Sequence, residues 1–165
     1  MSQVVLTLGD DISTDTIYPG RFMATVLPTE TPQFAFADLE VNARLRENRI
    51  AAGSVIVAGN NFGCGSSREQ AASTLKGHEL TIVAKGFARI FLQNSCNLGL
   101  RTIICRDIEA SEGDELEIRP DVVVNKTTGA TFSVEPLPKA RQAIIDAGGL
   151  IAYTRKRVLE SAPRG

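Results

Sequence analysis

Short apolar runs alternate with amphipathic stretches through the middle of this chain. The runs at residues 54–59, 80–86 and 101–106 have the length and the β-branched content of buried strands. The segments between them, 66–76 and 87–94, carry apolar residues at helical spacing. This strand–helix–strand–helix–strand order predicts right-handed crossovers and a parallel sheet that is covered on both faces.

The N-terminal part of the chain is less regular. Residues 3–8 predict another strand, and residues 38–49 predict an amphipathic helix that begins at a capping Asp38. Between them, prolines and glycine interrupt any periodic pattern across residues 16–36. A segment this long without regular structure is more often a functional or partner-binding loop than a passive link.

The pattern changes again after Glu109. Residues 114–120 and 121–136, with a turn at 127–129, predict antiparallel hairpin strands. Residues 137–149 predict a short helix that ends at a glycine C-cap.

Together these elements predict an α/β fold with a mixed, mainly parallel sheet and additional antiparallel hairpin strands. The length of 165 residues suits a single domain over residues 1–165. The charged segment 155–165 is expected to fray.

Composition narrows the possible partners. The chain is 43% hydrophobic and 22% charged, with a net charge of −1. It therefore has no basic field that would attract nucleic acid or an anionic membrane. No stretch approaches the roughly 20 apolar residues of a membrane span, and the N-terminus lacks the features of a signal peptide. We expect a cytoplasmic protein.

Residues that commonly bind metals are few. The chain has three cysteines without CxxC pairs, and His78 is its only histidine. We therefore predict no metal site within this chain. Any metal that the chemistry needs would come from a partner.

The stretch GNNFGCGSSREQAA, residues 59–72, follows a predicted strand and opens a predicted helix. Ligands of open α/β sheets bind at this position. The spacing lacks the lysine of a phosphate-binding loop, and Arg68 stands where a dinucleotide-binding motif has its third glycine. Neither of those functions is predicted.

Two interpretations of this stretch remain open. Ser66 and Glu69 have the spacing of a capping box, which would explain both residues without any function. A capping box does not explain the glycines or Arg68, a cation at the positive end of a helix, and these favour a bound carboxylate. Ser66 could then act as a base on a carbon acid, because nearby N–H groups would stabilise its alkoxide.

Three linked motifs carry a resemblance to a known family: GDDISTDTIYPGRFM, the glycine-rich stretch, and GFARIFLQNSCNLGL. In order and spacing they resemble the small subunits of the aconitase superfamily, in particular those of 3-isopropylmalate dehydratase and homoaconitase-type enzymes. The resemblance implies a swivelling β/β/α domain. It also implies a large partner subunit whose cysteines hold a [4Fe–4S] cluster. The implied activity is that of a hydro-lyase acting on a hydroxy dicarboxylate, with 2- and 3-isopropylmalate of leucine biosynthesis as the expected pair.

The resemblance also implies roles for individual residues. Ser66 matches the catalytic base, and Asp15 matches an active-site aspartate. Ser67 and Arg68 match a substrate-binding pair, and Gly65 precedes them where the backbone approaches the substrate.

Two further positions bear on substrate choice. Related tricarboxylate enzymes have an arginine where Ala24 stands, so its absence favours a substrate with an apolar group. Arg21 lies close enough in the sequence to replace that arginine. Homoaconitate, citramalate and dimethylmalate therefore remain alternative substrates, and a non-catalytic carboxylate-binding module remains an alternative function.

Overall fold

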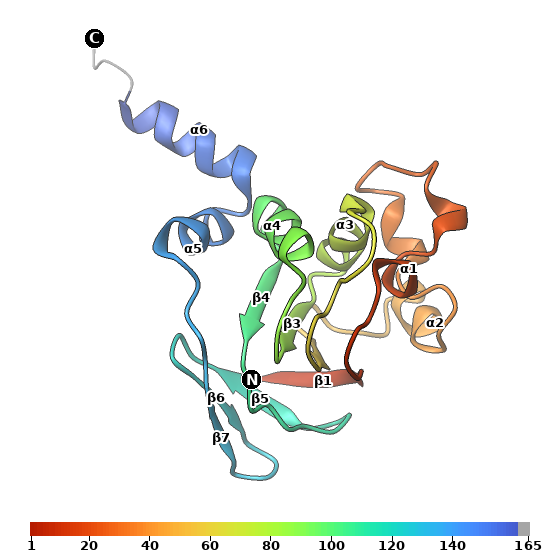
Figure 1. Cartoon of the computed structure of the whole chain (residues 1–165), viewed down its shortest axis with the longest axis vertical. Helices are drawn as coiled ribbons and strands as arrows, with labels where there is room; N and C mark the ends of the chain where they lie inside the picture. Colours follow the sequence, from red (N-terminus) through yellow and green to blue (C-terminus); the bar gives the residue numbers. More distant parts are fainter. Residues whose placement is uncertain (162–165) are drawn as a thin grey trace.

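The computed structural model describes residues 1–161, and across them seven strands form one sheet in the order β4-β3-β2-β1-β5-β6-β7 (Figure 1). The strands are β1 (Ser2–Thr7), β2 (Val55–Ala58), β3 (Thr81–Ala84), β4 (Arg101–Ile104), β5 (Glu115–Ile118), β6 (Val122–Asn125) and β7 (Thr131–Ser133). The helices are α1 (Thr14–Ile17), α2 (Val41–Arg46), α3 (Glu69–Gly77), α4 (Arg89–Leu98), α5 (Lys139–Asp146) and α6 (Leu150–Ser161), with short 3-10 turns η1 (Gly20–Phe22) and η2 (Thr31–Phe34).

The strands β1 to β4 are mutually parallel. β2 and β3 are buried along their whole length, and their register aligns Val55 with Thr81. Helices α3 and α4 make the crossovers between these strands, as the alternating pattern predicted. This half of the predicted fold is confirmed.

The strands β5 to β7 are antiparallel, as predicted for the C-terminal part. β5 pairs with β1, and β6 pairs with both β5 and β7. The turn after β6 is held by Asn125, whose Oδ1 accepts from the backbone N–H groups of Thr127 and Thr128. Glu135 N then donates to Ile104 O at 2.8 Å, so the chain after β7 returns to the free edge of β4.

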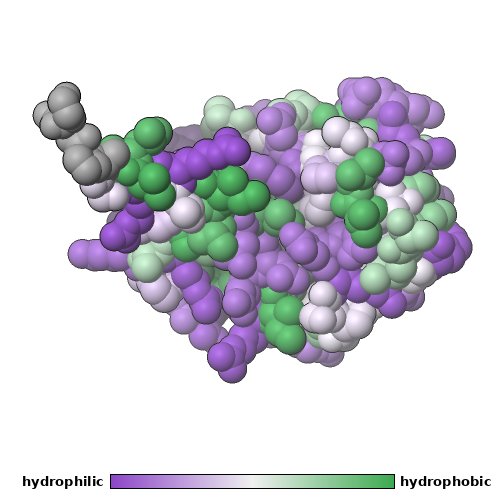
Figure 2. All heavy atoms as spheres, turned by 90° about the horizontal axis from the view of Figure 1, so that it is seen from above, coloured by the Kyte–Doolittle hydropathy of each residue, from purple (hydrophilic) through white to green (hydrophobic). Residues whose placement is uncertain are grey.

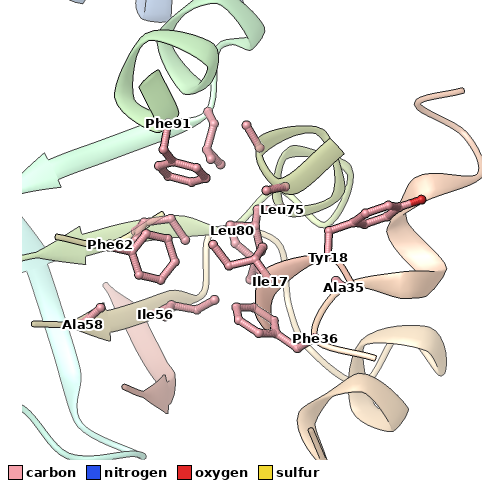
Figure 3. Close-up of a cluster of buried hydrophobic side chains, with 14 of the residues drawn as sticks. Ile17, Tyr18, Ala35, Phe36, Ile56, Ala58, Phe62, Leu75, Leu80 and Phe91 are labelled. Carbon is pink, nitrogen blue, oxygen red and sulfur yellow. The ribbon is translucent and has the colours of Figure 1, made fainter. Parts of the chain in front are cut away.

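The largest apolar cluster lies between the parallel strands and the helices. Figure 3 shows Phe62 and Ile56 facing Leu75 of α3, with Phe91 of α4 and Ile17 of α1 around them. All five side chains are at most 2% exposed. A second cluster on the other face of the sheet joins the parallel strands to β5 and β6, and includes Val4, Val57, Val83, Cys105, Leu116 and Val123.

Several predicted elements differ from the structure in their bounds. The helix expected at residues 38–49 covers only Val41–Arg46, and the one expected at 87–94 runs from Arg89 to Leu98. The latter ends where Gly99 adopts a left-handed conformation, with φ of +77°. The segment 16–36 contains one end of α1 and the turns η1 and η2.

The segment expected to fray after residue 155 is, as far as Ser161, the C-terminal part of helix α6. The fraying itself stays a prediction. Local contacts support this helix: Arg157 donates to the Tyr153 hydroxyl, and Ser161 donates to the carbonyl of Arg157. Its apolar side chains lie largely exposed at the end of the molecule next to the C-terminus (Figure 2). Residues 162–165 of the predicted tail lie outside the described residues. Among residues 1–161, no helix is both long and apolar enough to cross a membrane.

Candidate active site

The loops that follow β1 and β2 remain paired beyond the ends of their strands. Gly63 N donates to Ile12 O at 2.7 Å, and Thr14 N donates to Cys64 O at 2.8 Å. These contacts hold the two loops side by side at the carboxyl ends of adjacent parallel strands, where ligands of such sheets bind. The pairing therefore brings Asp15 next to the serine-containing turn, although the two are far apart in the sequence.

Ser66 lies exposed on this turn. Its carbonyl accepts hydrogen bonds from the Thr14 hydroxyl at 3.0 Å and from the Arg68 N–H at 2.9 Å. Its own Oγ lies 3.3 Å from Thr14 Oγ1. Gly65 precedes it with φ of +99°, a conformation that favours glycine. The turn thus fixes the serine backbone and leaves its side chain open to solvent.

Arg68 and Asp15 form an ion pair across the two loops. Arg68 Nη1 lies 2.7 Å from Asp15 Oδ1, and it also donates to the carbonyl of Tyr18 at 3.2 Å. The same Asp15 oxygen accepts from the backbone N–H of Gly20 at 2.8 Å. The hydrogen bond from Arg68, followed by that from Gly20, lowers the pKa of Asp15 below its usual range. Asp15 is therefore a carboxylate at neutral pH.

The Arg68 guanidinium has donors to spare. Both of its hydrogen bonds to residues 1–161 use Nη1, which leaves Nε–H and both hydrogens of Nη2 without a partner there. Its side chain is 20% exposed, whereas that of Asp15 is 67% exposed. Asp15 offsets part of the positive charge of Arg68. The Nε and Nη2 donors of Arg68 can bind a ligand carboxylate.

The predicted capping box is wrong. Helix α3 begins at Glu69, and its N-cap is Arg68, with φ of −75° and ψ of 112° and no side-chain cap. Ser66 lies too early in the chain to cap this helix, and its hydroxyl faces Thr14 instead. The structural explanation for Ser66 that the sequence left open therefore does not apply.

The other predicted site residues take no part in the hydrogen bonds among Thr14, Asp15, Ser66 and Arg68. Arg21 pairs with Asp38 through two hydrogen bonds of 3.1 and 2.5 Å, and its guanidinium lies over the Phe22 ring. The same pair lowers the pKa of Asp38, which does not cap α2. Ala24 is exposed in the turn after η1, and Ser67 is exposed beside Ser66 with no side-chain hydrogen bond to the described residues.

Thr14 belongs to this site, although the sequence motifs gave it no role. It is 3% exposed, and its hydroxyl is the group closest to the Ser66 side chain in the hydrogen-bond network. Its position next to Asp15 in the STDTI motif was the available signal. Its contact with Ser66, however, joins residues 52 positions apart and depends on the paired loops.

The described residues contain no group of three or more histidine, cysteine, aspartate or glutamate side chains that could hold a metal ion. Cys96 and Cys105 are buried, and burial raises the pKa of the Cys105 thiol to about 11. Such a thiol is protonated at neutral pH and is a poor metal ligand.

An exposed serine lies beside a partly free arginine at the strand ends of a mixed sheet, and this arrangement suits the binding of a carboxylate. Residues 11–107 match the aconitase C-terminal domain family, and the chain belongs to this family. It is 42% identical, over 92% of its length and 94% of the relative, to the 3-isopropylmalate dehydratase small subunit of Methanosarcina mazei.

Two further comparisons come from Methanocaldococcus jannaschii. Its isopropylmalate/citramalate isomerase small subunit is 38% identical over 95% of this chain and 95% of that protein. The crystal structure of 3-isopropylmalate dehydratase from this organism superposes with a TM-score of 0.88 and 37% identity, covering 99% of this chain and 98% of that one. These similarities confirm the predicted family and fold class.

Proposed function

We propose that this chain is the small subunit of a hydro-lyase that interconverts 2- and 3-isopropylmalate in leucine biosynthesis, in the cytoplasm and together with a large subunit. The observation that carries the proposal is the exposed Ser66, placed two residues before a partly free Arg68. The names of the relatives supply the substrate class and the need for a large subunit.

In this proposal Arg68 binds a substrate carboxylate through its Nε and Nη2 donors, with Ser67 and the backbone at Gly65 beside it. The carboxylate orients the neighbouring C–H toward Ser66, and the guanidinium offsets the negative charge that develops when the proton leaves. Asp15 holds the guanidinium in place through Nη1. Asp15 thus acts on the reaction by fixing Arg68.

Ser66, as an alkoxide, takes the proton from the carbon next to the carboxylate. The C–H electron pair becomes the double bond, and the hydroxyl of the adjacent carbon leaves with its own pair. Water then adds in the opposite sense, so that hydroxide joins the first carbon and the proton joins the second. One water leaves the substrate and one water is added, so the reaction needs no oxidant.

A [4Fe–4S] cluster in the large subunit would supply a Lewis acid for the departing hydroxyl. The described residues fit this division of labour, because they offer binding and base groups and no ligand set of their own.

Contacts of the 21–27 segment support a substrate with an apolar group. Arg21 is held by Asp38 and Phe22, and no basic residue stands at Ala24. Met23, Val26 and Leu27 are 39%, 64% and 55% exposed. This segment suits the isopropyl group of isopropylmalate better than the additional carboxylate of a tricarboxylate substrate. Citramalate, which carries a methyl group, is the second candidate, favoured by the name of the relative from Methanocaldococcus jannaschii.

The test is anaerobic reconstitution with the large subunit, followed by assays on isopropylmalate, citramalate and homoaconitate. We expect no turnover from this chain alone and the highest kcat/KM on isopropylmalate from the pair. A preference for homoaconitate would contradict the role given to Ala24, and turnover of none of these acids would contradict the hydro-lyase function.

A further inference from the structure

We propose that Thr14 is the positioning residue of the serine base, and that its hydroxyl both orients Ser66 and stabilises the Ser66 alkoxide. This inference rests on the proposed function, because it assigns a role to Thr14 only through Ser66. It concerns a residue to which the resemblance assigned no role.

Thr14 is itself held firmly. Its backbone N–H donates to Cys64 O at 2.8 Å, and its carbonyl accepts from Tyr18 N at 2.8 Å. Its side chain is almost fully buried, at 3% exposure. The hydroxyl therefore has little freedom to move, while the serine that it contacts lies exposed.

The two oxygen contacts of Thr14 both lead to Ser66. Thr14 Oγ1 donates to the Ser66 carbonyl at 3.0 Å and lies 3.3 Å from Ser66 Oγ. A buried hydroxyl needs a hydrogen-bond partner, and among the described residues Ser66 alone provides partners for this one. Gly65 shapes the turn that presents Ser66 to Thr14, because its φ of +99° is a left-handed conformation that favours glycine.

A threonine hydroxyl has one hydrogen and two acceptor lone pairs. While Ser66 is neutral, its O–H can donate to Thr14 Oγ1, and the Thr14 hydrogen points to the Ser66 carbonyl. When Ser66 is an alkoxide, rotation about the Thr14 Cβ–Oγ1 bond aims the same hydrogen at Ser66 Oγ. A hydrogen bond to a charged oxygen is the stronger of the two. Thr14 keeps its own proton throughout, and the proton taken from the substrate stays on Ser66.

The test compares Thr14→Val and Thr14→Ser in the reconstituted two-subunit enzyme. Thr14→Val keeps the shape but removes the donor, and loss of one such donor lowers kcat by about 10²–10³-fold. We expect that loss with KM changed little, and an upward shift of the acidic limb of the pH profile of kcat/KM, because the alkoxide becomes harder to form. Thr14→Ser should recover most of the activity.

Thr74→Val is the matched control. Thr74 is fully buried, and its hydroxyl donates to the carbonyl of Thr31 at 2.7 Å, so this variant also loses one buried hydroxyl–carbonyl hydrogen bond. We expect Thr74→Val to lower stability and to keep kcat and the pH profile. If Thr14→Val fails to fold or to bind the large subunit, Thr14→Ala is assayed in its place with the same expected loss of kcat.

Ser66→Ala distinguishes a failure of the serine base from a failure of the role given to Thr14. If Ser66→Ala retains activity, the serine base is wrong and the proposed mechanism falls. If Ser66→Ala is inactive while Thr14→Val, or Thr14→Ala in its place, keeps kcat within about twofold and an unshifted pH profile, the base stands and the role of Thr14 is overturned.

Discussion

Replacing Gly63 with alanine would force a side chain into the contact that holds the serine-containing turn against the core. Gly63 has φ of +84°, and its N–H donates to Ile12 O in the neighbouring loop. A Cβ at this position would lie 2.5 Å from the Cβ of Phe91 and closer still to its Cγ. Phe91 is 2% exposed and cannot move aside without disturbing its neighbours.

Two separate effects lower the folding stability of Gly63→Ala. The left-handed backbone conformation costs a residue with a Cβ about 1–2 kcal/mol. Overpacking against a buried ring costs about 1–3 kcal/mol more. The sum of about 2–5 kcal/mol is a large share of the 5–15 kcal/mol or so that stabilises a typical domain.

Urea unfolding followed by circular dichroism measures this cost, and Gly113→Ala is the matched control. Gly113 has φ of +91°, and a Cβ there would have no atom within 4 Å. The control carries the backbone cost alone, so Gly63→Ala should be less stable than Gly113→Ala by about 1–3 kcal/mol. Equal stabilities of the two variants would refute the close packing of this turn on Phe91.

Two further predictions concern the ionised side chains. Asp114 accepts hydrogen bonds from Asn125 and from the backbone of Ser111, which lower its pKa below the ordinary value of about 3.9. Its contribution to stability is therefore present above about pH 4 and is lost as the pH falls through the lowered value. Asp114→Asn should be less stable than the wild type at pH 7 in urea unfolding, and the gap should narrow as the pH falls below about 4; a gap of constant size across this pH range would contradict this. Arg68→Lys removes the planar pair of donors, and in the reconstituted enzyme kcat/KM should fall about 10- to 100-fold, matching a charged hydrogen bond of about 1.5–3 kcal/mol; an unchanged kcat/KM would show that Arg68 does not bind the substrate.

The parallel half of the sheet could be predicted from the sequence because its central strands are short apolar runs, which is the pattern of buried strands. β2 and β3 are apolar on both faces, and each is followed by a helix with an amphipathic pattern. The antiparallel hairpins were likewise visible from the turn residues after β6. These are local signals, carried by residues close together in the sequence.

The start of helix α3 could not be predicted from local sequence signals, because the expected capping box does not form. Serine and glutamate at the right spacing predicted a helix start, but Arg68 bonds to Asp15 and to Tyr18, 53 and 50 positions away. The backbone of Arg68 is extended, and the helix begins after it. The motif match had nevertheless named Asp15 and Arg68 together, and the structure places them in contact; the catalytic role of Ser66 stays a prediction.

The turnover of Ser66→Ala in the anaerobically reconstituted two-subunit enzyme tests the central claim most directly, with Ser133→Ala, an exposed residue of β7, as control. Loss of a catalytic base lowers kcat by about 10²–10⁴-fold. We predict a loss of that size for Ser66→Ala on isopropylmalate, with unchanged binding to the large subunit, and no loss for Ser133→Ala. A Ser66→Ala enzyme that turns over isopropylmalate within a few-fold of the wild type would contradict the account.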